Sequence, residues 1–357
     1  MNEKIKVLFI HNAVPEYRIE FWKGLAKKVE LKILITQNGL EDQIYGLDKN
    51  TETLDIVYWD KSWIKKVYDY DVVIVPPIES LKEYKIARAV ASKCKKSNRS
   101  CLYWNERWEW EGEVDSFIKK LSRWGHRKLI KKVCDECYGT IASGTKAKEY
   151  LEKLNTTYNV TIAYDSSTSP KAIEKIDFMR QYRISDKDKV ILYLGRVIKR
   201  KGLYNLLVSY KMINSNAWLI VGGDGEDYQR CYEYVENNKL DKVIFIGKVQ
   251  PEMRSEYFKR ADVFVLSSLL LEAWGLTVNE ALEQGTPVIV TDACGVAYDL
   301  ADGTNCIKIE SGNNIQLANM LSKLLKEPKN EVACKQHYQR FSVSNMVDSF
   351  YEVISKQ

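Results

Sequence analysis

Two carboxylates, Glu272 and Glu280, stand eight positions apart in the segment EAWGLTVNEAL. Short apolar runs that read as strands flank this segment, Asp262 to Leu266 before it and Pro287 to Val290 after it. Glu272 is therefore expected on a loop at the carboxyl end of a strand, and Glu280 about two turns into the next helix. Ligands of open α/β sheets bind at the carboxyl ends of strands. A carboxylate there accepts hydrogen bonds from sugar hydroxyls or stabilises an oxocarbenium-like centre. The alternative is two solvated glutamates at a helix end.

A basic loop follows the apolar run Val190 to Leu194. Gly195 permits a tight turn there and the close approach of a ligand. Arg196 and Lys201 then flank the start of a helix, where free N–H groups and two fixed cations suit a phosphate. The alternative is a solvated basic loop. A glycine-rich turn at Gly222 to Gly225 matches neither the full dinucleotide fingerprint nor a P-loop.

Carboxylates and cations at the same edge of a sheet suit a ligand that carries both sugar and phosphate, such as a nucleotide sugar. In this interpretation Arg196 and Lys201 bind the diphosphate. Glu280 binds the ribose hydroxyls, and Glu272 lies beside the transferred sugar.

Apolar β-branched runs alternate with amphipathic segments, which predicts an α/β fold with parallel strands and helices on both faces. The alternation breaks at the turn-rich segment Ser166 to Pro170 and then resumes. Each half has the size of one doubly wound domain, and a cleft between two such domains is a frequent ligand site. The expected units are residues 1–168, residues 169–340 and a final amphipathic helix over 341–357. The expected strands are Lys6 to Ile10, Leu31 to Thr36, Leu54 to Tyr58, Val72 to Val75, Ser100 to Trp104, Tyr138 to Ala142, Val160 to Ala163, Val190 to Leu194, Ala217 to Val221, Val243 to Ile246, Asp262 to Leu266, Pro287 to Val290 and Cys306 to Ile309.

The composition, with 45% hydrophobic and 29% charged residues, is typical of a soluble globular protein. No stretch approaches the roughly 20 apolar residues that span a bilayer. The chain leads from Met1 straight into a strand, which leaves no room for a signal peptide, so a cytoplasmic protein is expected. The 8 cysteines include a single C-x-x-C pair, Cys134 and Cys137, and only 3 histidines are present. A zinc site needs more ligands than this pair supplies, so no metal or redox role is expected for it.

The segment 117–133 carries seven lysines and arginines and no acidic residue. Ile118, Leu121 and Leu129 recur at helical spacing, so the segment predicts a basic amphipathic helix. Such a helix either binds an anionic membrane surface or is a solvated helix with one face on the core. Nucleic acid is not an expected partner, because no interleaved aromatic and basic sheet motif is present.

From Val190 to Leu324 the order and spacing of several motifs resemble the family 4 retaining glycosyltransferases, which have the GT-B fold of two Rossmann-like domains. The tail resembles the helix that crosses back to brace the first domain in that fold. The motifs are the loop with Gly195, Arg196, Lys201 and Gly202, the Val-Gly-Gly-Asp-Gly turn from Val221, the strand Val243 to Gly247, the run Ala261 to Val265, the Glu-x7-Glu pair of Glu272 and Glu280, the run Gly285 to Ile289, and Asp302 to Asn305.

The resemblance implies transfer of a sugar from a nucleotide-diphosphate donor with retention of the anomeric configuration. It assigns Arg196 and Lys201 to the donor phosphates, Glu272 to the donor sugar and Glu280 to the ribose. No metal or other cofactor is implied, and the leaving phosphate helps to take the proton of the acceptor. Further donor contacts are implied for the main chain at Trp274, Gly275 and Leu276, and for the base near Lys248 and Val249.

The first half matches the family less well. Its loop from His11 to Arg18 has a Pro-x-Tyr-Arg pattern that resembles some bacterial polysaccharide-assembly members. The expected acceptor is therefore a glycan or a lipid-linked sugar, at the inner face of a membrane. Aromatic and acidic residues from Tyr103 to Trp110 either stack on an acceptor sugar or pack under a loop. The acceptor-side candidates are His11, Asn12, Glu106 and His126, of which His11 could equally be a satisfied residue at the end of a loop.

Two other functions are compatible with this fold. A nucleotide-sugar 2-epimerase would show further acidic and histidine side chains in the cleft. A non-catalytic sugar-nucleotide-binding partner would not need the complete set of Arg196, Lys201, Glu272 and Glu280, which this chain has.

Overall fold

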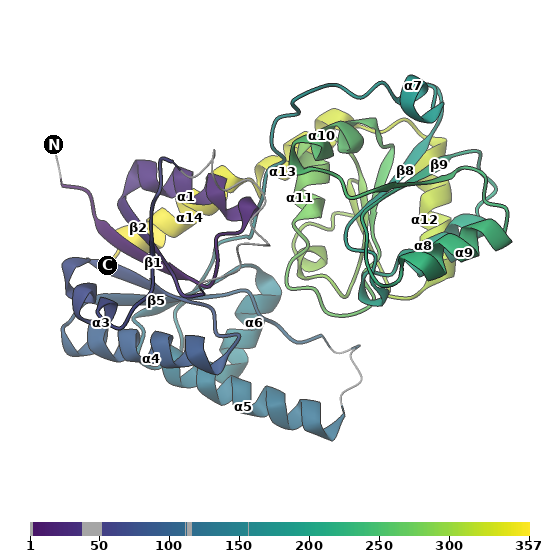
Figure 1. Cartoon of the computed structure of the whole chain (residues 1–357). Coiled ribbons are helices and arrows are strands. Elements are labelled where there is room, and N and C mark those ends of the chain that lie inside the picture. Colours follow the sequence, from purple (N-terminus) through teal and green to yellow (C-terminus); the bar gives the residue numbers. More distant parts are fainter. Residues whose placement is uncertain (1–2, 38–51, 111, 113–115, 156) are drawn as a thin grey trace. The chain divides into compact units, whose positions relative to one another are not determined.

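The computed structural model describes residues 3–37, 52–110, 112, 116–155 and 157–357. The chain forms two compact units (Figure 1). Unit 1 comprises Met1–Glu109, Val114–Ser167 and Val343–Gln357. Unit 2 comprises Trp110–Glu113 and Thr168–Ser342. None of the helices in the described part of the chain is both long enough and apolar enough to cross a membrane.

Unit 1 is built on a 7-stranded parallel sheet with the order β3-β2-β1-β4-β5-β6-β7. Its central strands are buried on both faces, as their continuous apolar sequences require. The strands are β1 Lys6–His11, β2 Glu30–Ile35, β3 Asp55–Tyr58, β4 Val72–Val75, β5 Ser100–Asn105, β6 Gly139–Ala142 and β7 Val160–Ile162. The helices are α1 Glu16–Lys28, α3 Trp63–Lys66, η2 Val67–Asp69, α4 Leu81–Lys96, α5 Phe117–Cys134 and α6 Thr145–Leu154.

The C-terminal helix α14, Val343–Ser355, packs against α1 and contributes to the core of unit 1 (Figure 1). Phe350 is fully buried, with its ring centroid 4.8 Å from that of Phe21 and 5.3 Å from that of Trp104. Edge-on aromatic contacts of this kind add to the hydrophobic gain. The last helix of the chain is therefore part of the hydrophobic core of the first unit.

Unit 2 has a 6-stranded parallel sheet with the order β10-β9-β8-β11-β12-β13. The strands are β8 Val190–Leu194, β9 Trp218–Gly222, β10 Val243–Gly247, β11 Val263–Leu266, β12 Val288–Thr291 and β13 Cys306–Ile309. The helices are α7 Phe178–Tyr182, η3 Lys199–Lys201, α8 Leu203–Met212, α9 Tyr228–Asn237, α10 Pro251–Arg260, α11 Thr277–Glu283, η4 Gly295–Tyr298, α12 Asn314–Lys326 and α13 Glu331–Gln339.

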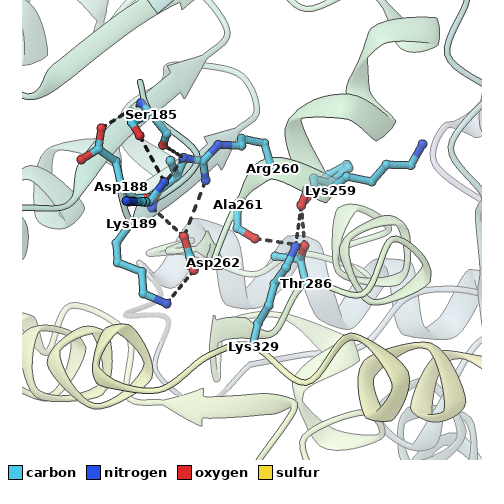
Figure 2. A network of polar contacts seen from close by, with 12 residues as sticks. Ser185, Asp188, Lys189, Lys259, Arg260, Ala261, Asp262, Thr286 and Lys329 are labelled. Atoms are coloured by element: carbon cyan, nitrogen blue, oxygen red, sulfur yellow. Dashed lines mark hydrogen bonds and ion pairs between the residues drawn. The ribbon is translucent and has the colours of Figure 1, made fainter. Parts of the chain in front are cut away.

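A polar network fixes the amino end of the sheet in unit 2 (Figure 2). Asp262, just before β11, accepts hydrogen bonds from the Val190 N–H at 2.9 Å and from Lys189 Nζ at 2.8 Å. The Arg260 guanidinium donates to the carbonyls of Ser185 and Asp188 at 2.7 and 2.8 Å. These contacts attach the segment that enters β8 to the end of α10, so the first strand of unit 2 has a defined start.

The strands predicted from the sequence are all present, and each end lies within one residue of its predicted position. The basic helix and the final helix are confirmed as α5 and α14. One local prediction is wrong. Glu280 lies in the first turn of α11, and not about two turns into a helix. The chain between β11 and α11 is irregular because main-chain hydrogen bonds hold it to the loop after β12.

Candidate functional site

The predicted donor residues of unit 2 follow the carboxyl ends of neighbouring strands. Gly195 and Arg196 follow β8, Lys248 and Val249 follow β10, and Glu272 lies between β11 and α11. Because β8 lies beside β9 and β11 in the sheet, the loops from these strands come together at one edge. This is the position at which open parallel sheets bind ligands.

Lys201 and Glu272 form an ion pair at this edge. Lys201 Nζ lies 2.5 Å from Glu272 Oε1, and Ser268 Oγ donates to Glu272 Oε2 at 2.6 Å. Both partners are largely buried, with 13% and 17% of their side chains exposed. A cation, a carboxylate and a hydroxyl are thus held together in a partly desolvated position, where charge-assisted hydrogen bonds are strong.

The main chain fixes Glu272 independently of its side chain. Its N–H donates to the Ala293 carbonyl at 2.8 Å, and its carbonyl accepts from the Gly295 N–H at 3.1 Å. The loop that carries the carboxylate is therefore attached to the loop after β12, and the side chain starts from a fixed backbone.

The ionised form of Glu272 is favoured. Burial opposes ionisation, but the charge of Lys201 and the hydrogen bonds from Lys201 and Ser268 outweigh it, so the pKa of Glu272 is lowered. Glu272 is an anion at neutral pH. It is suited to hydrogen-bond a sugar hydroxyl or to stabilise a developing positive charge.

The basic loop is attached to the loop that carries Glu272. The Leu269 N–H donates to the Arg200 carbonyl at 2.8 Å, and Arg200 Nη1 donates to the Leu271 carbonyl at 3.1 Å. Gly202 has φ +69°, and a Cβ there would lie 2.0 Å from the Ser267 carbonyl oxygen. Glycine at this position thus permits the contact that places Lys201 beside Glu272.

Arg196 lies at the outer side of the same edge, with an exposed side chain. Its carbonyl accepts a hydrogen bond from Tyr193 Oη at 2.9 Å. The glycine-rich turn after β9 packs on this loop, because a Cβ at Gly223, with φ +141°, would lie 1.8 Å from the Gly195 carbonyl oxygen. The turn is therefore a close structural support for the basic loop.

Glu280 is 2% exposed and pairs with Arg254 from α10. Arg254 Nη1 lies 3.4 Å from each carboxylate oxygen. Sequence reasoning did not identify Arg254 as a functional residue. No motif marks it, and the pairing depends on how α10 and α11 pack together.

The side chain of Trp274 is 3% exposed and serves as an internal anchor. Its Nε1 donates to Asn279 Oδ1 at 3.0 Å, and Asn279 Nδ2 donates to the Phe341 carbonyl at 3.1 Å. The Trp274 carbonyl accepts from the Val296 N–H at 3.1 Å. Gly275 and Leu276 complete this turn into α11, where the Gly275 carbonyl accepts from the Val278 N–H at 2.9 Å. The Trp274 side chain is therefore not available to a ligand, whereas main-chain groups of the turn remain candidates.

A pocket of about 580 Å³ opens beside Lys248 and Val249 in unit 2. One wall is the segment from Glu174 to Gln181, and the opposite wall comes from β10 and α10. Its volume and its mixed polar and apolar lining are those of a small-molecule site. The lining residues are Glu174, Lys175, Ile176, Asp177, Arg180, Gln181, Ile246, Lys248, Val249, Gln250, Met253 and Tyr257.

The acceptor-side candidates of unit 1 lie at the carboxyl edge of its sheet, but their environments differ. His11 is buried among Phe9, Trp22 and Trp104, and its Nδ1 lies 2.8 Å from the Ala13 carbonyl oxygen. Burial and the charge of Arg18 lower the pKa of His11 to about 3, so its ring is neutral. Its position is that of a satisfied residue at the end of a strand.

Asn12 and His126 have partners within unit 1. Asn12 Nδ2 donates to Glu79 Oε2 at 3.1 Å, which joins the ends of β1 and β4. His126, on α5, lies with Nε2 2.6 Å from the Ile78 carbonyl oxygen. Burial and the charge of Arg107 lower the pKa of His126, so this ring is also neutral at pH 7.

Glu106 belongs to a buried charge cluster that sequence reasoning missed. Arg18 pairs through both terminal nitrogens with Asp165, and its Nη2 lies 2.6 Å from Glu106 Oε1. Burial raises the pKa of Glu106 to about 7, against the opposing charge of Arg18. The signal available in the sequence was the arginine of the Pro-x-Tyr-Arg pattern. No sequence motif identifies Asp165 as the partner of Arg18, since the two residues are 147 positions apart.

Within the ranges that the structure describes, no group of three or more histidine, cysteine, aspartate or glutamate side chains is arranged to hold a metal ion. The cysteines, including Cys134 and Cys137, are free thiols.

The chain resembles known proteins in sequence and in fold. Residues 174–341 match the family model described as glycosyl transferases group 1. An uncharacterized glycosyltransferase of Methanocaldococcus jannaschii is 29% identical over 182 residues, which are 49% of this chain and 46% of that protein. The mannosylfructose-phosphate synthase of Agrobacterium fabrum is 28% identical over 196 residues, 51% of this chain and 43% of that protein. The chain thus spans less than half the length of these curated relatives.

Among solved structures, HepE of Anabaena in complex with UDP superposes with a TM-score of 0.77, covering 99% of this chain and 100% of HepE at 15% identity. The likeness extends over both units and confirms the predicted fold class. This chain is therefore a GT-B-fold protein whose residues 174–341 carry the sequence pattern of the glycosyl transferases group 1.

Proposed function

We propose that this protein is a glycosyltransferase that moves a sugar from a nucleotide-diphosphate sugar to a hydroxyl group of an acceptor. The observation that carries the proposal is the fixed set of Lys201, Glu272 and Ser268 at the carboxyl edge of the unit 2 sheet. The group 1 match over residues 174–341 and the names of the relatives support transfer as the reaction.

The nucleotide diphosphate is the part of the donor that the basic loop recognises. Lys201 and the exposed Arg196 supply positive charge for two phosphates that carry negative charge. The Lys201 ammonium has three N–H donors, so it can bond a phosphate oxygen and Glu272 together. Neutralisation by these cations replaces a metal ion in the proposal, so chelation by EDTA should leave the reaction rate unchanged.

Glu272 and Glu280 have separate roles in this proposal. Glu272, anionic and fixed by its main chain, lies beside the transferred sugar and stabilises the positive charge that develops at the anomeric carbon. Glu280, held by Arg254, accepts hydrogen bonds from the ribose hydroxyls. Main-chain groups of Trp274, Gly275 and Leu276 complete the donor site.

The pocket beside Lys248 and Val249 is our proposed location for the base. HepE, which has the same fold, was crystallised with UDP and with UDP-glucose, which supports a nucleotide sugar as the donor. Retention of the anomeric configuration, with attack on the face that the diphosphate leaves, is proposed from the family 4 resemblance.

The acceptor is proposed to bind on unit 1, and a glycan or a lipid-linked sugar is its expected class. Helix α5 supports contact with a membrane, because Ile118, Leu121 and Trp124 are 78%, 57% and 53% exposed. Lysines and arginines surround these side chains, and Lys128 Nζ lies 3.6 Å from the centroid of the Trp124 ring. Exposed apolar residues with surrounding cations suit the interface of an anionic bilayer.

The two alternative functions are less well supported. An epimerase would require more acid and base groups, and unit 2 contains a single histidine, His337, whose Nε2 lies 2.7 Å from the Leu300 carbonyl oxygen. A non-catalytic protein would not need the Lys201–Glu272 pair.

The proposed function is tested by nucleotide release. UDP-glucose, UDP-galactose, UDP-N-acetylglucosamine and GDP-mannose are each incubated with the protein, with and without octyl glycosides as acceptors. We expect release of the nucleoside diphosphate from at least one donor and a glycosylated product by mass spectrometry. Absence of release from every donor, together with absence of any thermal stabilisation by the nucleotides, would overturn the proposal.

A further inference from the structure

Arg18 is a charge that the donor chemistry does not use. It lies in the first turn of α1, and 1% of its side chain is exposed. The guanidinium carbon lies 4.5 Å from the centroid of the Trp104 ring and 4.8 Å from that of Tyr17. A buried cation needs a paired anion to be tolerated. Asp165, 3% exposed, supplies it through both carboxylate oxygens.

Glu106 is a second carboxylate that the neutralisation of Arg18 does not require. One anion already balances the cation, so the cluster of Arg18, Asp165 and Glu106 has a surplus of negative charge when Glu106 is ionised. Glu106 is also the member that reaches the surface, because 28% of its side chain is exposed. Its Oε1 is held by Arg18 at 2.6 Å, and no bond from the part of the chain that the structure describes occupies Oε2.

The position of Glu106 is that of a ligand-binding group. It follows the carboxyl end of β5, and Asp165 follows the carboxyl end of β7 in the same sheet. Arg18, just after β1, connects both. The first turn of α1 and the loop after β7 therefore combine to fix the carboxylate that follows β5.

The neighbouring side chains make this edge acidic. Glu79, after β4, is exposed, and its charge acts on Glu106. Glu83 is buried next to it and accepts the Glu79 N–H at 2.9 Å and Gln37 Nε2 at 2.8 Å. Arg107 and Lys82 are exposed cations near these carboxylates, and Lys82 Nζ donates to the Thr36 carbonyl at 2.6 Å. An anionic group of a ligand would be repelled here, whereas the hydroxyl groups of a sugar would find hydrogen-bond acceptors.

We propose that Glu106 hydrogen-bonds hydroxyl groups of an uncharged acceptor sugar, and that Arg18 and Asp165 are positioning residues that hold its carboxylate at the edge of the unit 1 sheet. The inference rests on the proposed function and specifies the chemical class of its acceptor. It also excludes an acidic sugar from the position beside Glu106.

The test compares acceptors that differ in charge. The nucleotide sugar hydrolysed fastest in the donor panel is used with octyl glucoside, octyl galactoside and octyl glucuronide, and release of the nucleoside diphosphate is measured. In the unmodified protein the two neutral glycosides should raise the rate of nucleoside diphosphate release above the rate of donor hydrolysis. The increase caused by the glucuronide should be about ten-fold smaller. Equal stimulation by the glucuronide, or none by the neutral glycosides, would overturn the inference.

Glu106→Gln keeps the shape of the side chain and removes its charge. We expect the KM for the neutral glycosides to rise about ten-fold, as for loss of a charged hydrogen bond. Thermal stabilisation by the nucleoside diphosphate of the donor should stay within about two-fold, because the proposed nucleotide site lies on unit 2. An unchanged acceptor KM in this variant would contradict the inference. If neither hydrolysis nor stabilisation by nucleotide occurs in the unmodified protein, the proposed function itself has failed.

The positioning role of Arg18 has its own readout. Arg18→Lys keeps the charge but loses the planar two-point contact. The kcat/KM for the acceptor should then reach its plateau at a higher pH than in the unmodified protein, because Glu106 is less well stabilised as an anion. Glu20→Gln is the matched control, since Glu20 lies on the same helix and pairs with Lys23 at 3.0 Å on the surface. A pH profile of Arg18→Lys that coincides with that of the control would rule out the positioning role.

Discussion

Lys201 Nζ lies 2.5 Å from Glu272 Oε1, so the predicted phosphate ligand and the predicted catalytic carboxylate are in direct contact. In the absence of ligand the two charges neutralise each other. A bound diphosphate would share the Lys201 ammonium with Glu272, and the carboxylate would remain available to the sugar. In the proposed reaction, the same contact would couple the binding of the leaving diphosphate to the position of the carboxylate beside the transferred sugar.

Glu272→Gln should leave the fold intact and reduce transfer about 100-fold or more, the size of loss found when one electrostatic group of a transition state is removed. The amide retains the size of the side chain but cannot balance a positive charge. Initial rates of nucleotide release measure the effect, and circular dichroism verifies the fold. Glu352→Gln, which is exposed on α14, is the control for loss of one negative charge. Full activity in Glu272→Gln would show that this carboxylate has no part in the reaction.

Arg254→Ala should destabilise unit 2, because it removes a cation that pairs with the buried Glu280 carboxylate. Only 3% of the Glu280 side chain is exposed, so the free energy of unfolding should fall by about 2 kcal/mol. Urea denaturation measures this change. The double variant with Glu280→Gln should recover part of the loss, since no buried charge then remains. Equal stability of Arg254→Ala and the unmodified protein would show that the pair is not coupled.

Much of this arrangement was predictable from the sequence. Strands such as β8 and β11 are short, and all their residues are buried. Because both faces of such a strand are covered, a continuous apolar run in the sequence shows where the strand begins and ends. Glu272 and Lys201 were predicted for the same edge because each follows a strand of one sheet. Their direct contact was not predicted, because it depends on main-chain bonds between the two loops.

Pairs between distant elements could not be predicted in this way. Arg254 and Glu280 meet because α10 and α11 pack together, and Arg18 and Asp165 meet across the unit 1 sheet. The sequence has no periodic signal for such contacts. The start of α11 was missed for a related reason, since the hydrogen bonds from Glu272 to Ala293 and Gly295 keep the preceding segment irregular.

The pH dependence of stability should differ between the two units. The pKa of Glu272 is lowered, so its stabilising contribution is present above its ordinary value of 4.5 and is lost as the pH falls below it. The pKa of Glu106 is raised to about 7, so this group makes the fold less stable as the pH rises from 4.5 to 7. Glu106→Gln should therefore flatten the decline of the melting temperature between pH 5 and 7. A decline of the same steepness in the variant would contradict the assignment.

Helix α5 should bind vesicles that contain about 30% anionic phospholipid and not vesicles of phosphatidylcholine alone. Co-sedimentation measures the bound fraction, which should fall as the salt concentration rises. The double variant Lys119→Glu and Lys120→Glu should abolish binding. Lys356→Glu, an exposed change on α14, should not. Binding that is independent of salt, or unaffected by the double variant, would contradict an electrostatic membrane contact.

The most direct test of the donor site is the melting temperature with UDP and GDP. The unmodified protein should be stabilised by at least one of the two nucleotides, as expected for a ligand that binds the folded state. Lys201→Ala should lose most of this stabilisation, because a main phosphate ligand is gone. Lys259→Ala, with an exposed lysine on α10, should retain it. A nucleotide that stabilises Lys201→Ala as much as the unmodified protein would show that the donor phosphates are not bound beside Glu272.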